Sequence, residues 1–401
     1  MVNRQDNDTR VAGQLSGLLA VGSAYAAQGF GYAVVATALP AVKDRVGLSE
    51  TMVSALLLAM CLAAAVGSLL ADWMAVRWNS GRGLLIGFVV QAIALLLATT
   101  LTSVPGFIVA LSIYGIGLGT VDAASNMQGV LLQARSATPV FGRLYASYTV
   151  AAILGTLMTV AFAAFDLPGI ATLAVAAILA LVLTAVASRY YDPTRAAHRA
   201  DDHGKGRAPL PRRGIWIVGS FILAAFVVDS AVSVWSTLYL EDGLGASDSL
   251  APLGYAAYLV VVLVSRVAAD PVVARFGRRT TATFAVVMAA IGCLIVATVH
   301  TPAGAIIGFA VAGTTAGLLV PVAFSRAGEL APARSDEVIA RVNLFNYAGA
   351  FAGAVLLGAL AGNASSLGFG FLIPLIILVA VFPLLRSLRS APMVPIRPTE
   401  I

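Results

Sequence analysis

The sequence predicts an all-α integral membrane protein, with twelve transmembrane helices in two pseudo-symmetric six-helix bundles. Three observations lead to this prediction: a large excess of apolar residues, charge-free segments of membrane-spanning length, and an internal repeat. Of the 401 residues, 59% are hydrophobic and only 11% are charged, whereas soluble proteins carry about 25% charged residues. Such a chain has too few polar residues to cover its apolar surface in water, so we expect a lipid bilayer to surround it.

The charge-free segments locate the predicted helices, since one crossing of a bilayer takes about 20 residues. These segments are 11–42, 51–71, 83–121, 144–165, 167–188, 280–325 and 342–385. The three longest contain turn residues near their middles, SVPG at 103–106, HTPAG at 300–304 and GNASS at 362–366, which predict helical hairpins. Adding segments 106–132, 215–240 and 250–269 gives twelve spans. Lipid offers no partner for an unpaired backbone group, so each span is expected to be a helix.

The basic residues predict the orientation. With the N-terminus in the cytoplasm, only Lys43 and Arg45 of the 25 basic residues lie outside, and the other 23 lie inside or at inner helix ends, as the positive-inside rule requires. The net charge of +6 is then a topology signal, and it does not call for a nucleic-acid partner. A polar segment rich in Arg and Pro, 189–214, divides the chain into an N-terminal bundle (1–188), a cytoplasmic linker (189–214) and a C-terminal bundle (215–401).

An internal repeat relates the two bundles at a constant offset of 198 positions. The pairs at this offset are Asp72 and Asp270, Arg77 and Arg275, Trp78 and Phe276, Gly115 and Gly313, Gly119 and Gly317, and Arg143 and Arg341. Several ordered matches at one offset indicate a duplicated six-helix unit. Two such halves, related by an axis along the membrane normal, are typical of secondary transporters that rock around a midplane site.

Several motifs resemble a known family. The stretch DPVVARFGRR, 270–279, resembles the signature of the major facilitator superfamily between helices two and three, while the first copy departs from it at Ser68, where the family has glycine. GLGTVDAASNMQGVLLQ (117–133), VVDSAVSVWSTLYL (227–240) and GLLVPVAFSRAGE (317–329) resemble a bacterial branch near the fucose-permease-like transporters. The resemblance spans essentially the whole chain. It implies the fold of that superfamily, in the bacterial cytoplasmic (inner) membrane, with both termini cytoplasmic.

The resemblance also implies a cytoplasmic gate. In the superfamily the signature aspartate accepts hydrogen bonds from the start of a helix in the opposite half. Asp72 is then expected to face the start of helix eleven near Arg341, and Asp270 the start of helix five near Arg143. The expected gate residues are Asp72, Arg77, Arg143, Asp270, Arg275 and Arg341. The alternative for the arginines is that they only anchor the topology.

Two acidic residues, Asp122 and Asp229, lie deep in predicted spans, where a charge is costly and usually faces a cavity. Other polar and aromatic residues recur at helical spacing on the same or neighbouring predicted helices. The expected proton and substrate cavity comprises Tyr25, Gln28, Tyr32, Asp122, Asn126, Tyr145, Tyr148, Asp229, Ser233, Trp235, Asn343, Asn346 and Tyr347. The alternatives are hydrogen bonding between helices for the acids and plain packing for the aromatic residues.

The predicted function is secondary active transport of a small organic solute by alternating access, with proton coupling through Asp122 or Asp229. Burial disfavours the charged form of a carboxylate, so binding a proton can be exchanged for binding solute. Two acids and no deep basic residue favour a neutral or cationic solute. The alternatives are a drug or metabolite efflux antiporter and, in a different class, a transporter-like receptor that moves nothing.

An enzyme is not expected. No histidine lies in the middle of a predicted span, and Cys61 and Cys293 lie in separate spans, so neither a catalytic pair nor a metal site is predicted. Lys43 and Lys205, the two lysines of the chain, lie in no phosphate-binding GxxxxGK[ST] loop. We expect no cofactor, and a monomer whose partners are the solute, protons and lipid.

Overall fold

The computed structural model describes residues 4–47, 50–136, 138–194, 209–247, 250–361 and 367–388, which form helices joined by short connections. The helices of the first part are α1 (Arg4–Val46), α2 (Glu50–Arg77), α3 (Ser80–Thr100), α4 (Val104–Ser136), α5 (Phe141–Ala164) and α6 (Ala171–Ala187). Those of the second part are α7 (Arg212–Leu238), α8 (Leu253–Thr298), α9 (Pro302–Ala312), α10 (Val320–Leu330), α11 (Ser335–Ala361), α12 (Leu367–Gly370) and α13 (Leu372–Val381). Short 3₁₀ or π segments extend or join them: η1 (Ser188–Tyr190), η2 (Tyr239–Gly243), η3 (Thr315–Leu319), η4 (Pro332–Arg334) and η6 (Phe382–Leu388).

Eleven helical stretches of the described residues are long and apolar enough to cross a membrane. One of them, α8, is 46 residues long and contains Gly277, at which two helical segments meet. Gly277 has φ 78° and ψ 159°, a backbone conformation that is open essentially to glycine alone. The glycine of the repeated signature therefore makes the turn between two segments that are each long enough to span a bilayer.

Two of the three expected hairpin turns lie among the described residues, and both are at the predicted positions. A short connection around SVPG separates α3 from α4, and another around HTPAG separates α8 from α9. The third expected turn, 362–366, lies outside the described residues, as does most of the expected linker, 195–208. The described start of the linker is fixed to α4, because Asp192 pairs with Arg135 at 2.6 Å and exchanges backbone hydrogen bonds with the Gln128 amide.

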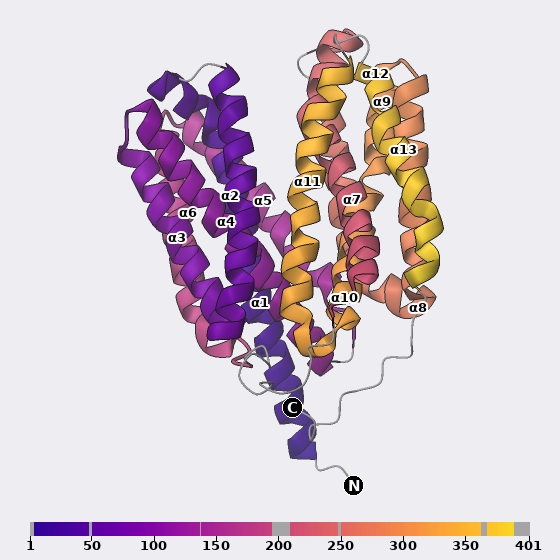
Figure 1. Ribbon diagram of the computed structural model, residues 1–401. Coiled ribbons are helices and arrows are strands. Elements are labelled where there is room, and N and C mark those ends of the chain that lie inside the picture. The colour runs from indigo at the N-terminus through magenta and orange to yellow at the C-terminus, as the bar shows by residue number, and fades with distance from the viewer. Residues whose placement is uncertain are drawn as a thin grey trace.

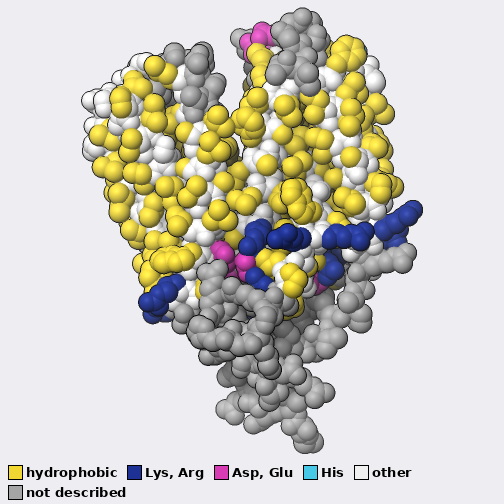
Figure 2. All heavy atoms as spheres, in the orientation of Figure 1, with side chains coloured by type: hydrophobic (Ala, Val, Ile, Leu, Met, Phe, Trp, Pro, Cys, Tyr) yellow, Lys and Arg dark blue, Asp and Glu magenta, His cyan; other side chains and the backbone are white. Residues whose placement is uncertain are grey.

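The helices lie in two groups, α1–α6 on one side and α7–α13 on the other (Figure 1). Helix α11 packs against α2 and α4, and α5 packs against α8. The two groups approach each other toward the end from which α1 starts, and they diverge toward the opposite end (Figure 1). Figure 2 shows apolar side chains over the flanks, a hollow between the groups at the diverging end, and Lys and Arg side chains gathered toward the other end. The end at which the Lys and Arg side chains gather carries Arg77, Arg143 and Arg278 and is called the basic end.

Close contacts through glycine hold each group together, and they repeat between the groups. Gly115 and Gly119 of α4 lie against the backbone of Met60 and Ala64 in α2. In the second group the corresponding glycines are Gly313 and Gly317, which lie against the backbone carbonyls of Tyr258 and Val262 in α8. These contact partners also correspond in the repeat, because Met60 and Tyr258 are 198 positions apart, as are Ala64 and Val262.

A methyl group at Gly119 would overlap the backbone carbonyl of Ala64. We therefore expect Gly119→Ala to force α2 and α4 apart, at the cost of about 1–3 kcal/mol that is typical of overpacking. The melting temperature of the detergent-purified protein should fall. Gly83→Ala is the matched control, because its new methyl would meet only ordinary contacts, the nearest at 3.5 Å from Met74 Cβ. Equal melting temperatures for the two variants would contradict this account of the packing.

Candidate functional site

Asp122 of α4 lies half-buried between the two groups of helices. Its carboxylate accepts a hydrogen bond from Gln28 Nε2 of α1 at 2.7 Å and another from the Tyr347 hydroxyl of α11 at 2.8 Å. Gln28 is oriented in turn by Gln91 of α3, whose Nε2 donates to Gln28 Oε1 at 2.8 Å. Because Tyr347 belongs to the second group, the carboxylate of Asp122 links the two groups directly.

A second set of polar contacts lies one helical turn along α4. Asn126 accepts hydrogen bonds at its Oδ1 from the hydroxyls of Tyr25, at 2.7 Å, and Tyr145, at 3.0 Å. The rings of these two tyrosines meet edge to face, with centroids 5.1 Å apart. Asn126 also donates from Nδ2 to the backbone carbonyl of Asp122. Residues expected from spacing on α1, α4 and α5 are therefore in mutual contact.

Asp229 of α7 lies half-buried in the second group. Its carboxylate accepts a hydrogen bond of 2.6 Å from the hydroxyl of Tyr258, a fully buried residue of α8. Tyr32 of α1 is 44% exposed and lies near enough to Asp122 and Asp229 to interact electrostatically with both. Ser233, one turn beyond Asp229 on the same face of α7, is exposed. These residues provide polar groups on both sides of the space between the groups.

Three other expected cavity residues have different surroundings. The Trp235 indole Nε1 donates to the Ala354 carbonyl of α11 at 2.9 Å, so this ring joins two helices of the second group. Asn343 donates from Nδ2 to Ser68 Oγ of α2 at 2.8 Å and to the Tyr347 hydroxyl at 3.3 Å. Asn346 is half-buried on the same helix.

At the basic end, Asp270 of α8 meets the N-terminus of α5. Its two carboxylate oxygens accept hydrogen bonds from the backbone N–H of Gly142, at 2.8 Å, and of Arg143, at 3.1 Å. Arg143 Nε adds an ion pair at 3.1 Å, with half of its side chain exposed. A helix N-terminus carries unpaired N–H groups and partial positive charge, and so it suits a carboxylate. The expected contact between Asp270 and the start of α5 is present.

The first copy of the signature is arranged differently. Arg341 pairs with Glu337 on its own helix at 2.7 Å, and Asp72 lies near Asp336 at the start of α11. One polar contact between the groups here is that of Asn343 with Ser68, one turn before Asp72. Arg77 and Arg275 are exposed at the basic end, where Arg275 lies over the ring of Phe276.

The expectation that no basic residue lies deep between the helices is wrong. Arg266 of α8 is only 8% exposed and lies between the two groups. Its Nη1 donates to the Tyr145 carbonyl at 3.3 Å and to the hydroxyl of Thr149. From its place in the sequence, Arg266 was expected to be one of the topology-setting charges at inner helix ends. The spacing of four residues between Arg266 and Asp270, which places both on one helical face, was the signal that it would face the first group.

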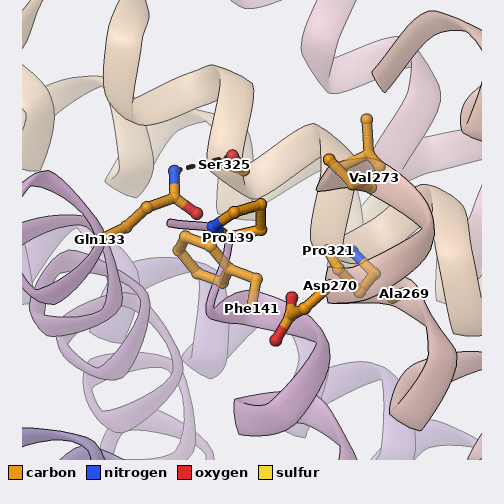
Figure 3. Close-up of a pocket in the computed structure, with 9 residues that line it drawn as sticks. Gln133, Pro139, Phe141, Ala269, Asp270, Val273, Pro321 and Ser325 are labelled. Carbon is orange, nitrogen blue, oxygen red and sulfur yellow. Dashed lines mark hydrogen bonds between the residues drawn. The ribbon is translucent and has the colours of Figure 1, made fainter. Parts of the chain in front are cut away.

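Apolar and uncharged contacts complete the closure at the basic end. Phe141 of α5 stacks on Phe324 of α10 with centroids 6.5 Å apart, and Gln133 donates to Ser325 Oγ at 2.8 Å. Figure 3 shows this hydrogen bond beside Asp270, around a small cavity of about 10 Å³. Such a volume holds about one water molecule. The described helices of the two groups therefore leave no room for an organic solute in this cavity.

The chain matches the family model of the Major Facilitator Superfamily over residues 21–268 and 217–400, and it therefore belongs to this family of transporters. It is 25% identical over 353 residues to an uncharacterized MFS-type transporter of Yersinia pestis, covering 88% of this chain and 91% of that protein. It is 28% identical over 336 residues to the uncharacterized transporter y4wD of Sinorhizobium fredii, covering 82% and 87%. The protein is a multi-pass membrane transporter and not an enzyme.

Solved structures agree in fold. The transporter FucP in the outward conformation matches with a TM-score of 0.80 at 13% identity, covering 94% of this chain and all of that one. The proton:xylose symporter XylE matches with a TM-score of 0.72 at 19% identity, covering 94% and 96%. At these identities the likeness concerns the fold alone. The family-model match confirms the resemblance to this superfamily that the sequence motifs indicate.

Replacing Asp270 by Asn removes the charge that faces the N-terminus of α5, and we expect it to loosen the closure of the basic end. Val322 lines the small cavity at this end. In a protein whose Cys61 and Cys293 have been replaced, the substitution Val322→Cys provides a single cysteine that reports the opening. Its alkylation by a maleimide should become several-fold faster in Asp270→Asn. Arg279→Gln, which removes an exposed charge on the same helix, should leave the rate unchanged. An unaltered rate in Asp270→Asn would speak against a closing role.

Proposed function

We propose that the protein is a secondary active transporter that moves a small organic solute by alternating access and couples this movement to protons. The observation that carries the proposal is the contact of Asp122 with Tyr347. It places an ionisable, half-buried carboxylate at the junction of the two groups of helices. Membership of a transporter family and the presence of Asp229 on the opposite side support the same function.

We infer that the chain crosses the membrane twelve times in two related halves, 1–188 and 215–401, joined by a linker at 189–214. The break of α8 at Gly277 supports the count, since it divides the longest of the eleven candidate spans into two. The glycine contacts of α4 with α2, repeated at the same offset by Gly313 and Gly317 with α8, support the relation between the halves. Tight packing within each half suits two bodies that move as units.

The arrangement in the structure corresponds to a state open on one side of the membrane. The basic end is closed by the contacts of Asp270, Gln133 and Phe141, and the molecule is hollow between the halves at the other end (Figure 2). By the positive-inside rule we infer that the basic end faces the cytoplasm, with both termini on that side and the opening on the outer side of the inner membrane. The likeness to FucP in the outward conformation supports this assignment.

A proton can control the link between the halves through Asp122. As a carboxylate, Asp122 accepts a charge-assisted hydrogen bond from Tyr347, which is stronger than a bond to a neutral acceptor. Protonation removes that charge, weakens the link and lowers the desolvation cost of closing the site around the carboxyl group. Asp229, held by Tyr258, offers a second site of the same kind in the other half. FucP of E. coli is a fucose:proton symporter and XylE is a proton:xylose symporter, which supports proton symport here.

Asp122→Asn keeps the size of the side chain but removes the group that takes up a proton. The test solute is chosen first, as the member of a metabolite panel that raises the melting temperature of the purified wild-type protein most. Its transport is then measured in proteoliposomes that contain a pH-sensitive dye. We expect this solute to drive protons across the membrane with the wild-type protein and not with the variant. Thermal-shift measurements should still show solute binding by the variant, because the amide of Asn retains hydrogen-bonding capacity.

Asp166→Asn, in the connection between α5 and α6, is the matched control and should couple normally. Asp229→Asn, measured in parallel, tests the second acid. If only this variant loses coupling, the proton site is Asp229. Full proton flux in both the Asp122 and the Asp229 variants would remove the basis for proton coupling, and the absence of any solute movement by the wild-type protein would remove the basis for transport.

A further inference from the structure

Arg266 is a buried cation between the halves, and none of the contacts described so far accounts for its charge. Its guanidinium lies over the rings of Tyr145 and Tyr148, at 5.2 and 5.9 Å from their centroids. Its Nη1 donates to a carbonyl and a hydroxyl, both on α5. Its Nε is buried and has no acceptor. These partners orient the guanidinium, but none of them carries a negative charge.

The acidic residues around Arg266 are engaged elsewhere. Asp270, one turn further along α8, accepts its hydrogen bonds from the start of α5. Asp229 lies near enough to interact electrostatically with Arg266, but its carboxylate is held by Tyr258. Among the described residues, no carboxylate oxygen forms an ion pair with Arg266. A buried charge without a counter-charge is strongly disfavoured, so the site is suited to a negative partner from outside the chain.

The internal repeat shows that closing the interface between the halves does not itself require a cation. The position of Arg266 in the first half is Ser68, and that of Tyr145 in the second half is Asn343, each at the offset of 198. Ser68 and Asn343 are joined by an uncharged hydrogen bond of 2.8 Å. The two equivalent contacts thus differ in that one is neutral and the other brings a positive charge between the halves.

We propose that Arg266 is the subsite for a carboxylate group of the transported solute. This inference rests on the proposed transport function and names its substrate class. Arg266 lies four residues before Asp270, about 6 Å further from the basic end along the helix, and so on the side of the closure that faces the hollow. A guanidinium presents paired N–H donors that match the two oxygens of a carboxylate. A single cation suits a singly charged carboxylate better than a phosphate dianion.

The tyrosines around Arg266 define the rest of the subsite. Tyr145 and Tyr148 flank the guanidinium with their rings, and half-buried Tyr148 lies toward Asp122 and Tyr32. Aromatic faces that also carry hydroxyl groups fit a small solute with both apolar and hydroxyl-bearing parts. A small hydroxylated carboxylate satisfies these groups together, whereas a cationic solute would be repelled by Arg266.

The test uses matched pairs of a carboxylate and its uncharged counterpart: gluconate and sorbitol, glucuronate and glucose, lactate and propane-1,2-diol, and glycerate and glycerol. Thermal shift of the purified full-length protein measures binding, and proteoliposomes with a pH-sensitive dye measure transport. We expect at least one carboxylate to stabilise the wild-type protein and to move with protons, while its counterpart does neither. Arg266→Gln should weaken that binding by tenfold or more, while Arg279→Gln, which loses an exposed arginine of the same helix, should bind normally.

Arg266→Lys provides a second variant that keeps the charge and loses the paired donors, and it should bind the carboxylate more weakly than the wild-type protein but more tightly than Arg266→Gln. The carboxylate subsite is overturned if no carboxylate stabilises the wild-type protein, or if both variants bind carboxylates as the wild-type protein does. It is also overturned if only uncharged members bind. Transport of an uncharged member that is unaffected by Arg266→Gln would leave the proposed transporter intact while removing the subsite. Absence of any solute movement would instead contradict the transport function itself.

Discussion

The whole arrangement depends on the inability of lipid to solvate charge. The flanks of the molecule are apolar (Figure 2), and the deep charged groups, Asp122, Asp229 and Arg266, all lie between helices, where other polar groups surround them. A charge on the lipid side would cost several kcal/mol. This constraint brings the polar side chains of many helices to one place, the seam between the halves, where we propose that a solute and a proton bind.

The seam and the interior of each half are held by different kinds of contact. Within the halves, glycines such as Gly119 and Gly317 bring helix backbones together with no room for a side chain. Between the halves, the polar contacts of the described residues include hydrogen bonds and the partly exposed ion pair of Asp270 with Arg143. The Arg143 side chain of this pair is half exposed, and partly exposed ion pairs are weaker than buried contacts, so we propose that the closure at the basic end breaks while each half stays intact. Rigid halves with a weak polar seam are what alternating access requires.

The sequence was informative where structure depends on local composition. Charge-free runs and turn residues located the helices, and the resemblance to the major facilitator superfamily implied the contact of Asp270 with the start of α5. Prediction from the sequence failed where the direction of a side chain depends on how the helices pack. Trp235 shares the polar stretch of α7 with Asp229, yet its indole is directed to the backbone of α11. Arg266 resembles a topology-setting charge because it lies near the end of a predicted span, and only the packing of α8 against α5 shows that it is buried. Arg341 pairs within its own helix, a pairing that the spacing of four residues from Glu337 already allowed.

The central claim is that the halves tilt about the polar seam, so that one end opens as the other closes. Spin labels at Arg82 and Thr280, near the basic end, and at Thr102 and His300, at the other end, form two pairs across the seam, each related by the repeat offset of 198. Distances within both pairs, measured by pulsed electron paramagnetic resonance in nanodiscs as the pH is lowered and solute is added, report the two ends separately. The account predicts opposite changes, with the basic-end distance lengthening while the other shortens. Distances that stay constant, or that change in the same direction at both ends, would contradict it.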